Sequence, residues 1–188
     1  MAVLPIRIMG DPVLHAPAHP VEEITDDIRA LVADMLETMD AAPGVGLAAP
    51  QVGVPLRIFT YAYADDDGNP WRGVAINPEL WIAPLEPGAP DEETEAEGCL
   101  SFPGERFPLR RSERALLTGT DLDGEPVRLA VDGWRARILQ HEFDHLDGVL
   151  YIDRLDDGAW KTVQKIARKR GWGRPGQQWT PGVDDIDA

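Results

Sequence analysis

The stretch QHEFDHLDG, at residues 140–148, contains the residue types of a hydrolytic metal site. His141 and His145 are four positions apart, so on a helix both imidazoles lie on one face and can reach one ion, while Glu142 lies beside a bound water. A catalytic site of this kind takes three protein ligands and leaves one position to water. The motif therefore predicts a metal site whose third ligand lies elsewhere in the chain.

The third ligand is not provided by the usual downstream positions. Tyr151 stands where a metzincin has its third histidine, and no glutamate follows Glu142. Cys99, the only cysteine, lies in EGCLSFP and offers a thiolate, which suits a borderline-soft metal. We expect Cys99 to be the ligand. The alternatives are Asp153, His15 and His19.

Three helices are predicted to position this chemistry. Residues 26–40 have helical apolar spacing, with Thr25 as the cap. From Gly133 to a stop at Gly148, the chain predicts a helix that is apolar on most sides and carries the two histidines. A last helix is expected over residues 156–170.

Extended segments fill the remainder of the chain. Residues 57–63 favour a strand, and Asp123-Gly124 predicts a hairpin turn. Two short extended pieces, 74–80 and 81–86, contain prolines that favour sheet edges or bulges over the sheet centre. Strands without regular alternation with helices indicate an α+β fold, with largely antiparallel β-sheets around the central histidine-bearing helix and a helix near each terminus.

With 188 residues, the chain can bury one substantial core. We expect a catalytic domain over residues 1–170 and an extended or disordered C-terminal tail over residues 171–188. There is no secretory signal pattern and no run of 18 apolar residues, so we expect a cytoplasmic protein without a membrane partner.

The charge is uneven along the chain. A net charge of −15 disfavours DNA as a partner, because the mean field opposes binding of a polyanion. Residues 159–174 nevertheless contain six basic residues and no acid, whereas the rest of the chain has 33 acids against 12 bases. This local reversal indicates either a solvated helix face or a docking surface.

Three motifs, in order along the chain, resemble the signature motifs of peptide deformylases: GVGLAAPQ at 44–51, EGCLS at 97–101 and QHEFDH at 140–145. The similarity extends over about residues 6–170. It implies a metal-dependent hydrolase that removes the formyl group from the N-terminal formylmethionine of nascent chains and releases formate.

The resemblance also implies roles for individual residues. Its three metal ligands would be Cys99, His141 and His145. Glu142 would be the general acid/base that takes a proton from the metal-bound water and delivers it to the departing amine. The side-chain amide of Gln51 and the backbone N–H of Leu100 would stabilise the oxyanion, and Gly46 would bring the backbone close to substrate.

The substrate's methionine should enter an apolar pocket near the metal. Our candidates for its lining are Val45, Ile138 and the aliphatic stem of Arg137. We expect an extended peptide to pair in strand fashion beside the GVG and EGC segments. Glu97 is expected to be structural, paired with Arg106 or Arg111.

For the metal, ligand chemistry alone favours Zn(II), whereas the resemblance implies Fe(II), with Zn(II), Ni(II) or Co(II) as substitutes. The resemblance further implies ribosome docking through the basic last helix, and we expect a monomer.

Two other functions compete with that of a deformylase. One is an HExxH metallopeptidase that cleaves internal peptide bonds, and the other is a protein-binding module with a structural metal.

Overall fold

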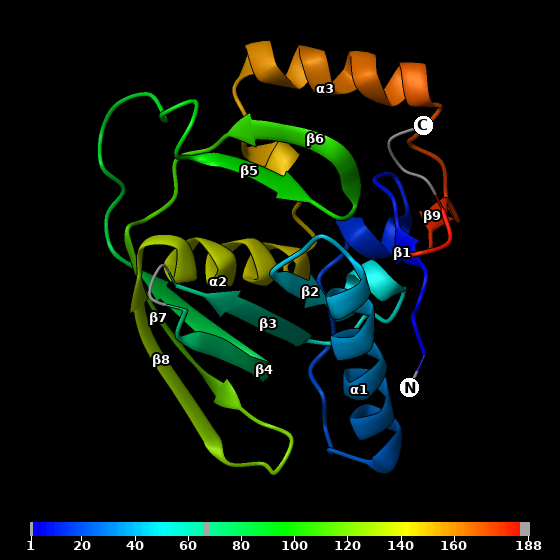
Figure 1. Cartoon of the computed structure of the whole chain (residues 1–188), viewed down its shortest axis with the longest axis vertical. Coiled ribbons are helices and arrows are strands. Elements are labelled where there is room, and N and C mark those ends of the chain that lie inside the picture. Colours follow the sequence, from blue (N-terminus) through cyan, green and yellow to red (C-terminus); the bar gives the residue numbers. More distant parts are fainter. Residues whose placement is uncertain (1, 66–67, 185–188) are drawn as a thin grey trace.

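Stacked layers of sheet and helix make up the computed structural model, which describes residues 2–65 and 68–184 (Figure 1). A curved five-stranded sheet forms one layer, a buried helix crosses it, and a two-stranded hairpin covers the other side of that helix. A third helix lies outside the hairpin. The predicted α+β fold, with antiparallel sheets around a central helix, is confirmed.

The α-helices lie where periodicity predicted them. They are α1 (Asp26–Ala41), α2 (Gly133–Leu146) and α3 (Asp157–Arg170). Thr25 caps α1 by accepting a hydrogen bond from the N–H of Ile28 at 3.4 Å. Short 3-10 helices lie at Pro12–His15, Ala49–Val52 and Tyr151–Arg154.

The five-stranded sheet is antiparallel, in the order β2-β3-β4-β7-β8. Its strands are β2 (Gly46–Ala48), β3 (Ile58–Ala64), β4 (Pro70–Ile82), β7 (Arg114–Thr120) and β8 (Pro126–Asp132). The predicted hairpin at Asp123-Gly124 joins β7 to β8, and Gly124 has φ of 79° in the left-handed region. Because β2 is an edge strand, one of its sides is not covered by this sheet.

One strand differs from expectation. The first of the two short pieces predicted at sheet edges, 74–80, belongs wholly to the 13-residue β4, which occupies the centre of the sheet, and the second, 81–86, contributes only its first two residues to that strand. Proline removes one ladder donor, and the register between β4 and β7 shifts between Ile76 and Glu79, around Pro78. The bulge is therefore confirmed, while the edge position is wrong, because a local irregularity lets the strand continue through the proline.

Among the described residues, the remaining strands form two smaller sheets. The hairpin of β5 (Ala96–Cys99) and β6 (Phe102–Pro108) holds the turn after Cys99. β1 (Ile6–Arg7) pairs with β9 (Gln178–Trp179). The segment after α3, predicted to be extended or disordered, is thus extended at β9, where Trp179 is only 5% exposed. The domain boundary at residue 170 stays a prediction.

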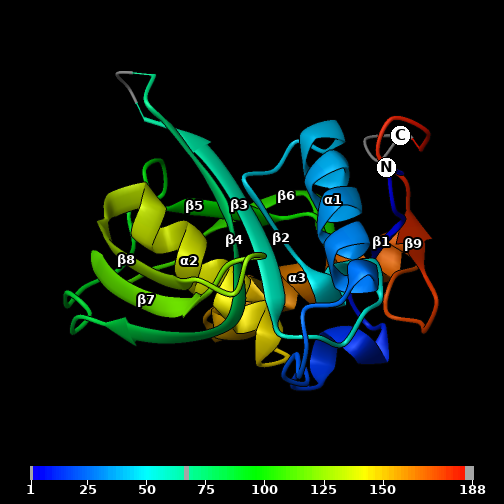
Figure 2. The same cartoon turned by 90° about the horizontal axis from the view of Figure 1, so that it is seen from below.

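The α2 helix lies in the concave side of the five-stranded sheet, which curves around it (Figure 2). Ile138, Leu139 and Leu146 pack with Phe59 and Leu117 of the sheet. The opposite side of α2 carries polar residues that are nevertheless buried beneath the β5–β6 hairpin. No helix in the described part of the chain has the length and apolar character needed to cross a lipid bilayer.

Buried polar contacts hold α2 in this position. The side chain of Gln140 accepts from the N–H of Ser112 at 3.0 Å and donates to its carbonyl oxygen at 2.8 Å. The carboxylate of Asp144 binds Arg111 at 2.6 Å and Arg154 at 2.6 Å. α2 is therefore tied both to the segment that precedes β7 and to the segment that follows the helix.

We expect Asp144→Ala to lower the free energy of unfolding by about 3 kcal/mol, because it removes one of the two carboxylates that pair with the buried Arg111 guanidinium. Asp147→Ala is the matched control. It removes the carboxylate that binds Arg57, but this side chain is 50% exposed, so the loss should stay below about 1 kcal/mol. Urea unfolding of both variants measures the difference, and equal losses would contradict a structural role for the buried pair.

Candidate metal centre and active site

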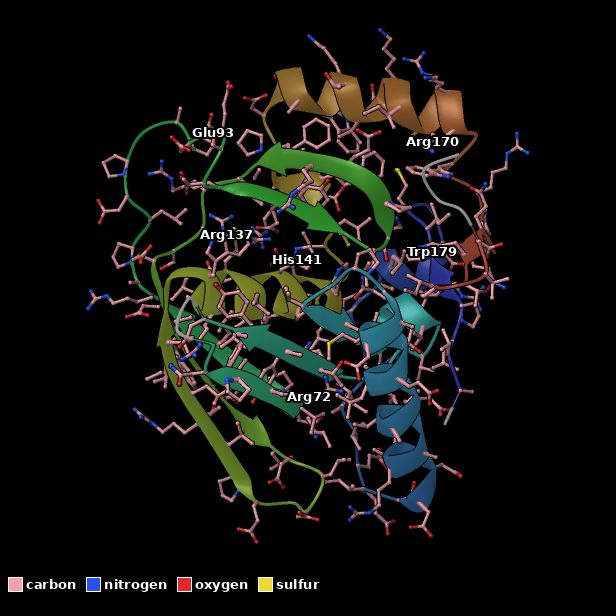
Figure 3. The ribbon with its side chains drawn as sticks, in the orientation of Figure 1. Arg72, Glu93, Arg137, His141, Arg170 and Trp179 are labelled. Atoms are coloured by element: carbon pink, nitrogen blue, oxygen red, sulfur yellow. The ribbon has the colours of Figure 1, made fainter. Side chains whose placement is uncertain are left out.

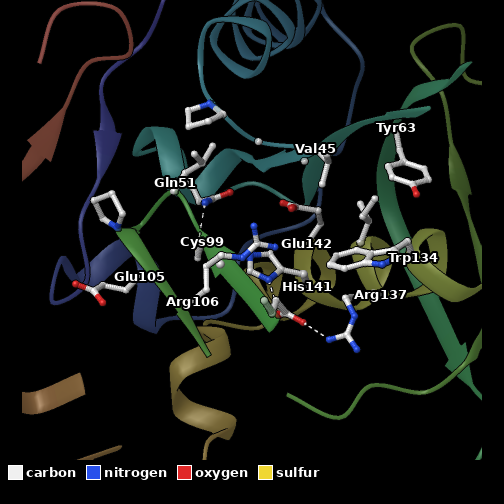
Figure 4. Close-up of a pocket in the computed structure, with 18 of the residues that line it drawn as sticks. Val45, Gln51, Tyr63, Cys99, Glu105, Arg106, Trp134, Arg137, His141 and Glu142 are labelled. Carbon is white, nitrogen blue, oxygen red and sulfur yellow. Dashed lines mark hydrogen bonds and ion pairs between the residues drawn. The ribbon is translucent and has the colours of Figure 1, made fainter. Parts of the chain in front are cut away.

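Three potential metal ligands meet between α2 and the β5–β6 hairpin. The Sγ of Cys99 lies 3.3 Å from Nε2 of His145, which lies 3.2 Å from Nε2 of His141. The three ligand atoms all lie within 4.8 Å of one another. Figure 3 places His141 in the layer between α2 and the hairpin, and Figure 4 shows it beside Cys99.

The cluster fits a bound divalent ion. For tetrahedral coordination at zinc bond lengths, ligand atoms should be separated by about 3.3 to 3.6 Å, close to the distances observed here. Two ring nitrogens and a sulfur that face one another need a cation or a proton between them, since each carries a lone pair. The predicted set of Cys99, His141 and His145 is thus brought together by the fold.

The alternative third ligands lie in other contacts. A carboxylate oxygen of Asp153 accepts a hydrogen bond from the N–H of Leu150 at 2.8 Å. Nε2 of His15 accepts from the N–H of Gly10 at 3.0 Å, and His19 is exposed. Tyr151 is completely buried. Among these candidates, the geometry favours Cys99.

Glu97 orients the first histidine. Its Oε1 accepts a hydrogen bond from Nδ1 of His141 at 2.6 Å, which turns Nε2 of that ring toward Cys99. The carboxylate also pairs with Arg111 at 2.6 Å and with Arg137 at 3.0 Å. The expected pair with Arg111 is present, while Arg106 donates instead to the carbonyl oxygen of Ala96.

These contacts set the charges around the cluster. Burial alone would raise the pKa of Glu97, but the hydrogen bonds and charges of His141 and Arg111 hold this pKa well below its usual range. Burial likewise opposes protonation of His141, but Cys99 and Glu97 raise its pKa well above the usual value. Burial and His141 lower the pKa of His145, which favours the neutral, ligating form. A cation in the cluster would replace the proton held by His141.

Glu142 lies on the same helix, beside the cluster. Its side chain is buried, and burial raises its pKa to about 7. Its Oε2 has no hydrogen-bond partner among the described residues. Burial of such an oxygen costs free energy unless a bound group forms a hydrogen bond with it. The space for this carboxylate comes from Gly46, where an added Cβ would lie 2.2 Å from Oε1.

Gln51 reaches the cluster from the Ala49–Val52 helix. Its Oε1 accepts from the N–H of Ala48 at 2.8 Å, which directs the NH2 group toward the site. That group donates to the hydroxyl oxygen of Ser101 at 3.3 Å and lies 3.6 Å from the Sγ of Cys99. Leu100, in the turn between β5 and β6, lies against Gly44.

Gln51, Cys99, His141 and Glu142 line a cavity of about 490 Å³ (Figure 4). The three predicted pocket residues, Val45, Arg137 and Ile138, all line it, as do Leu100 and Gly46. Val45 is 41% exposed at the mouth, whereas Ile138 is buried. Arg137 is mostly engaged elsewhere, because its guanidinium binds Glu97 and the carbonyl oxygen of Leu109.

Sequence reasoning missed two aromatic residues of the cavity, Tyr63 and Trp134. Trp134 lies in the first turn of α2, but its side chain is 39% exposed and the Arg137 guanidinium lies 5.3 Å from its ring centre. Its position one turn before Ile138 on the helix that carries the histidines could have indicated it.

The fold and the site together define a class: a hydrolase that carries HExxH on a buried helix, with a candidate Cys/His/His metal centre open to a cavity. The comparisons with known proteins narrow this class. The family model for polypeptide deformylase matches residues 3–160.

Individual relatives agree with the family model. A peptide deformylase of Rhodococcus opacus (strain B4) is 50% identical, over 97% of this chain and 95% of that relative. The crystal structure of a Thermus thermophilus peptide deformylase matches with a TM-score of 0.75 and 38% identity, over 89% of this chain and 94% of that one. An Ehrlichia chaffeensis peptide deformylase in complex with actinonin matches with a TM-score of 0.77 and 34% identity, over 90% and 98%.

The chain belongs to the polypeptide deformylase family, and it is a peptide deformylase enzyme.

We expect Gly46→Ala to reduce deformylase turnover by roughly 100-fold, because the new methyl group must displace the Glu142 carboxylate. The metal content should stay unchanged, since Glu142 is not one of the three residues whose potential ligand atoms cluster. Turnover and metal analysis of the purified variant check this expectation. Gly158→Ala, on α3, is the matched control, and turnover of Gly46→Ala equal to that of this control would contradict the close approach.

Proposed function

We propose that this enzyme hydrolyses the formyl amide of N-formylmethionyl peptides, including nascent chains, and releases formate. The observation that carries this proposal is the Cys99/His141/His145 cluster beside the buried Glu142, with Cys99, His141 and Glu142 lining one cavity. Membership of the deformylase family supports the choice of the formyl amide over an internal peptide bond.

Cys99, His141 and His145 would hold one divalent ion, for which we propose Fe(II), with Zn(II), Ni(II) or Co(II) able to substitute. When bound, such an ion supplies a Lewis acid for the formyl carbonyl and lowers the pKa of a coordinated water. Glu97 supports the site by holding the His141 ring in the orientation in which its Nε2 faces the other two ligands.

Glu142 would move the proton. With its pKa raised by burial to about 7, the carboxylate can accept a proton from the attacking water and later donate one to the leaving amine near neutral pH. The C–N bond of the formyl amide then breaks, the water oxygen remains in formate, and the peptide leaves with a free amino group. The unpaired Oε2 is the atom that supports this assignment.

Gln51 and the backbone N–H of Leu100 would stabilise the negative charge that develops on the formyl oxygen. The NH2 group of Gln51 is directed toward Cys99 by the hydrogen bond that its oxygen accepts from Ala48. Neutral donors of this kind stabilise the transition state more than the ground state, because the charge is larger there.

The cavity would receive the methionine side chain. Val45, Ile138 and the stem of Arg137 provide an apolar lining, to which we add Trp134 and Tyr63. The peptide backbone would extend along β2, whose outer edge is not covered by the five-stranded sheet and whose Gly46 lines the same cavity. An added strand at such an edge contributes main-chain hydrogen bonds that do not depend on the peptide sequence.

We expect the protein, purified without oxygen, to release formate from a formyl-Met tripeptide and to leave the unformylated tripeptide intact. Glu142→Gln should lower kcat by at least about 100-fold, because the amide cannot accept and return the proton, while the metal content stays the same. Formate release and metal analysis measure both quantities. Internal cleavage without formate would show a metallopeptidase instead, and loss of metal from Glu142→Gln would contradict the proton-carrier role.

We further propose that α3 docks on the ribosome. Its Val163 and Ala167 face the body, whereas Lys161, Lys165 and Lys169 are exposed at a spacing of four. This places the same charge sign along one helix face in a protein whose net charge is −15. Ribosomal RNA is a polyanion that such a face can bind.

Reversal of Lys161, Lys165 and Lys169 to glutamate should weaken cosedimentation with ribosomes by at least about 10-fold at low salt, because phosphate attraction becomes repulsion. Turnover of a formyl-Met tripeptide should be unchanged. Reversal of three exposed arginines, Arg29, Arg114 and Arg128, makes the same charge change elsewhere and is the control. Equal cosedimentation of the two variants would contradict docking through α3.

A further inference from the structure

We propose that Trp179 is a positioning residue for the sulfur of Cys99, acting through the peptide group that joins Leu100 to Ser101. This inference rests on the proposed metal role of Cys99. It assigns to the segment after α3 a function at the metal centre.

The contact is direct and buried. The indole Nε1–H of Trp179 donates to the carbonyl oxygen of Leu100 at 2.8 Å, and the side chain is only 5% exposed. The N–H at the other end of the same peptide group, that of Ser101, donates to the Sγ of Cys99 at 3.3 Å. One peptide plane therefore connects the indole to the sulfur.

Two hydrogen bonds on one peptide group act together. A donor at the carbonyl oxygen polarises the amide and strengthens its N–H as a donor, by roughly 10–30% per bond. The N–H in turn stabilises charge on the sulfur and fixes the direction from which the sulfur meets an ion. Trp179 thus both orients the peptide plane and sets how much negative charge the sulfur retains.

The segment around Trp179 is itself held against the body of the protein. β9 pairs with β1, and the N–H of Gly176 donates to Asp11 at 2.9 Å. Where the segment crosses residue 10, the backbones approach so closely that a Cβ on Gly10 would lie 2.4 Å from the Cα of Gly173. These contacts hold the backbone on which the indole is carried in one position.

The segment that receives the indole is held from a second direction as well. The N–H of Met9, just after β1, donates to the carbonyl oxygen of Ser101 at 2.8 Å. Met9, just after β1, and Trp179 of β9 therefore bind consecutive carbonyl groups, those of Ser101 and Leu100, in the turn that follows Cys99. The same turn carries the Leu100 N–H that we propose as an oxyanion donor.

The Co(II)-substituted protein provides a test that does not depend on turnover, because its thiolate-to-cobalt charge-transfer band reports the sulfur directly. Trp179→Phe keeps an aromatic ring but removes the N–H. We expect the band to move to longer wavelength, since a sulfur with a weaker hydrogen bond gives up its electron more easily. We also expect Co(II) affinity, measured by chelator competition, to fall about 3- to 10-fold, less than when a direct partner of a ligand is removed.

A second variant keeps the test interpretable if the phenylalanine variant folds poorly. Benzothienylalanine at position 179 keeps the two-ring shape and replaces only the N–H by sulfur, and it should give the same band shift with native circular dichroism. Trp172→Phe is the matched control. Trp172 lies in the same segment and packs edge-on against Phe102, with ring centres 5.2 Å apart, so the band should not move.

The outcomes separate this inference from the proposed function. An unchanged band and affinity within twofold in both Trp179 variants would overturn the role of Trp179, as would an equal shift in Trp172→Phe. A wild-type protein without a thiolate band would overturn both the metal role of Cys99 and this inference. A wild-type protein with the band but without formate release would contradict only the proposed reaction.

Discussion

The pairing of the buried Glu97 carboxylate is the interaction on which the site depends. Glu97 comes from β5, and it binds His141 and Arg137 of α2 together with Arg111 from the segment before β7. A carboxylate at 4% exposure is tolerated only when its charge is matched by good geometry. Here the same match that offsets the cost of burial aligns the imidazole and fixes the hairpin over the helix, so that folding and ligand orientation share one set of contacts.

The site also depends on the close packing of α2 against β2. α2 is shared between the sheet on one side and the polar site on the other, so a single rigid element carries Glu142 and both histidines. The edge strand β2 approaches it so closely that Gly46 leaves room for the Glu142 carboxylate only because it lacks a side chain. The motif GVGLAAPQ therefore also has a packing role: it shapes the wall against which the carboxylate rests.

The sequence could predict those features that residues close together in the chain determine. Helix ends followed from Thr25, from Gly148 and from apolar spacing, and the choice of Cys99, His141 and His145 as candidate ligands followed from motif chemistry and resemblance. The central place of β4 could not be seen, because Pro78 argues locally for an edge, and the bulge that accommodates it depends on pairing with β7. The contact of Trp179 with Leu100 joins residues 79 positions apart and has no local signal. The double role of Arg137, as cavity wall and as partner of Glu97, likewise needs the folded chain.

The distribution of the three candidate ligands along the chain has a consequence for stability. Cys99 and His145 are 46 positions apart in the chain, on separate elements. An ion that joins them would close a long loop, as a disulfide does, in a protein whose single cysteine cannot form an internal one. Because such an ion would bind the folded chain better than the unfolded one, its free concentration would enter the folding equilibrium. The supply of metal would then determine the fraction of the protein that is folded, as well as the rate of turnover.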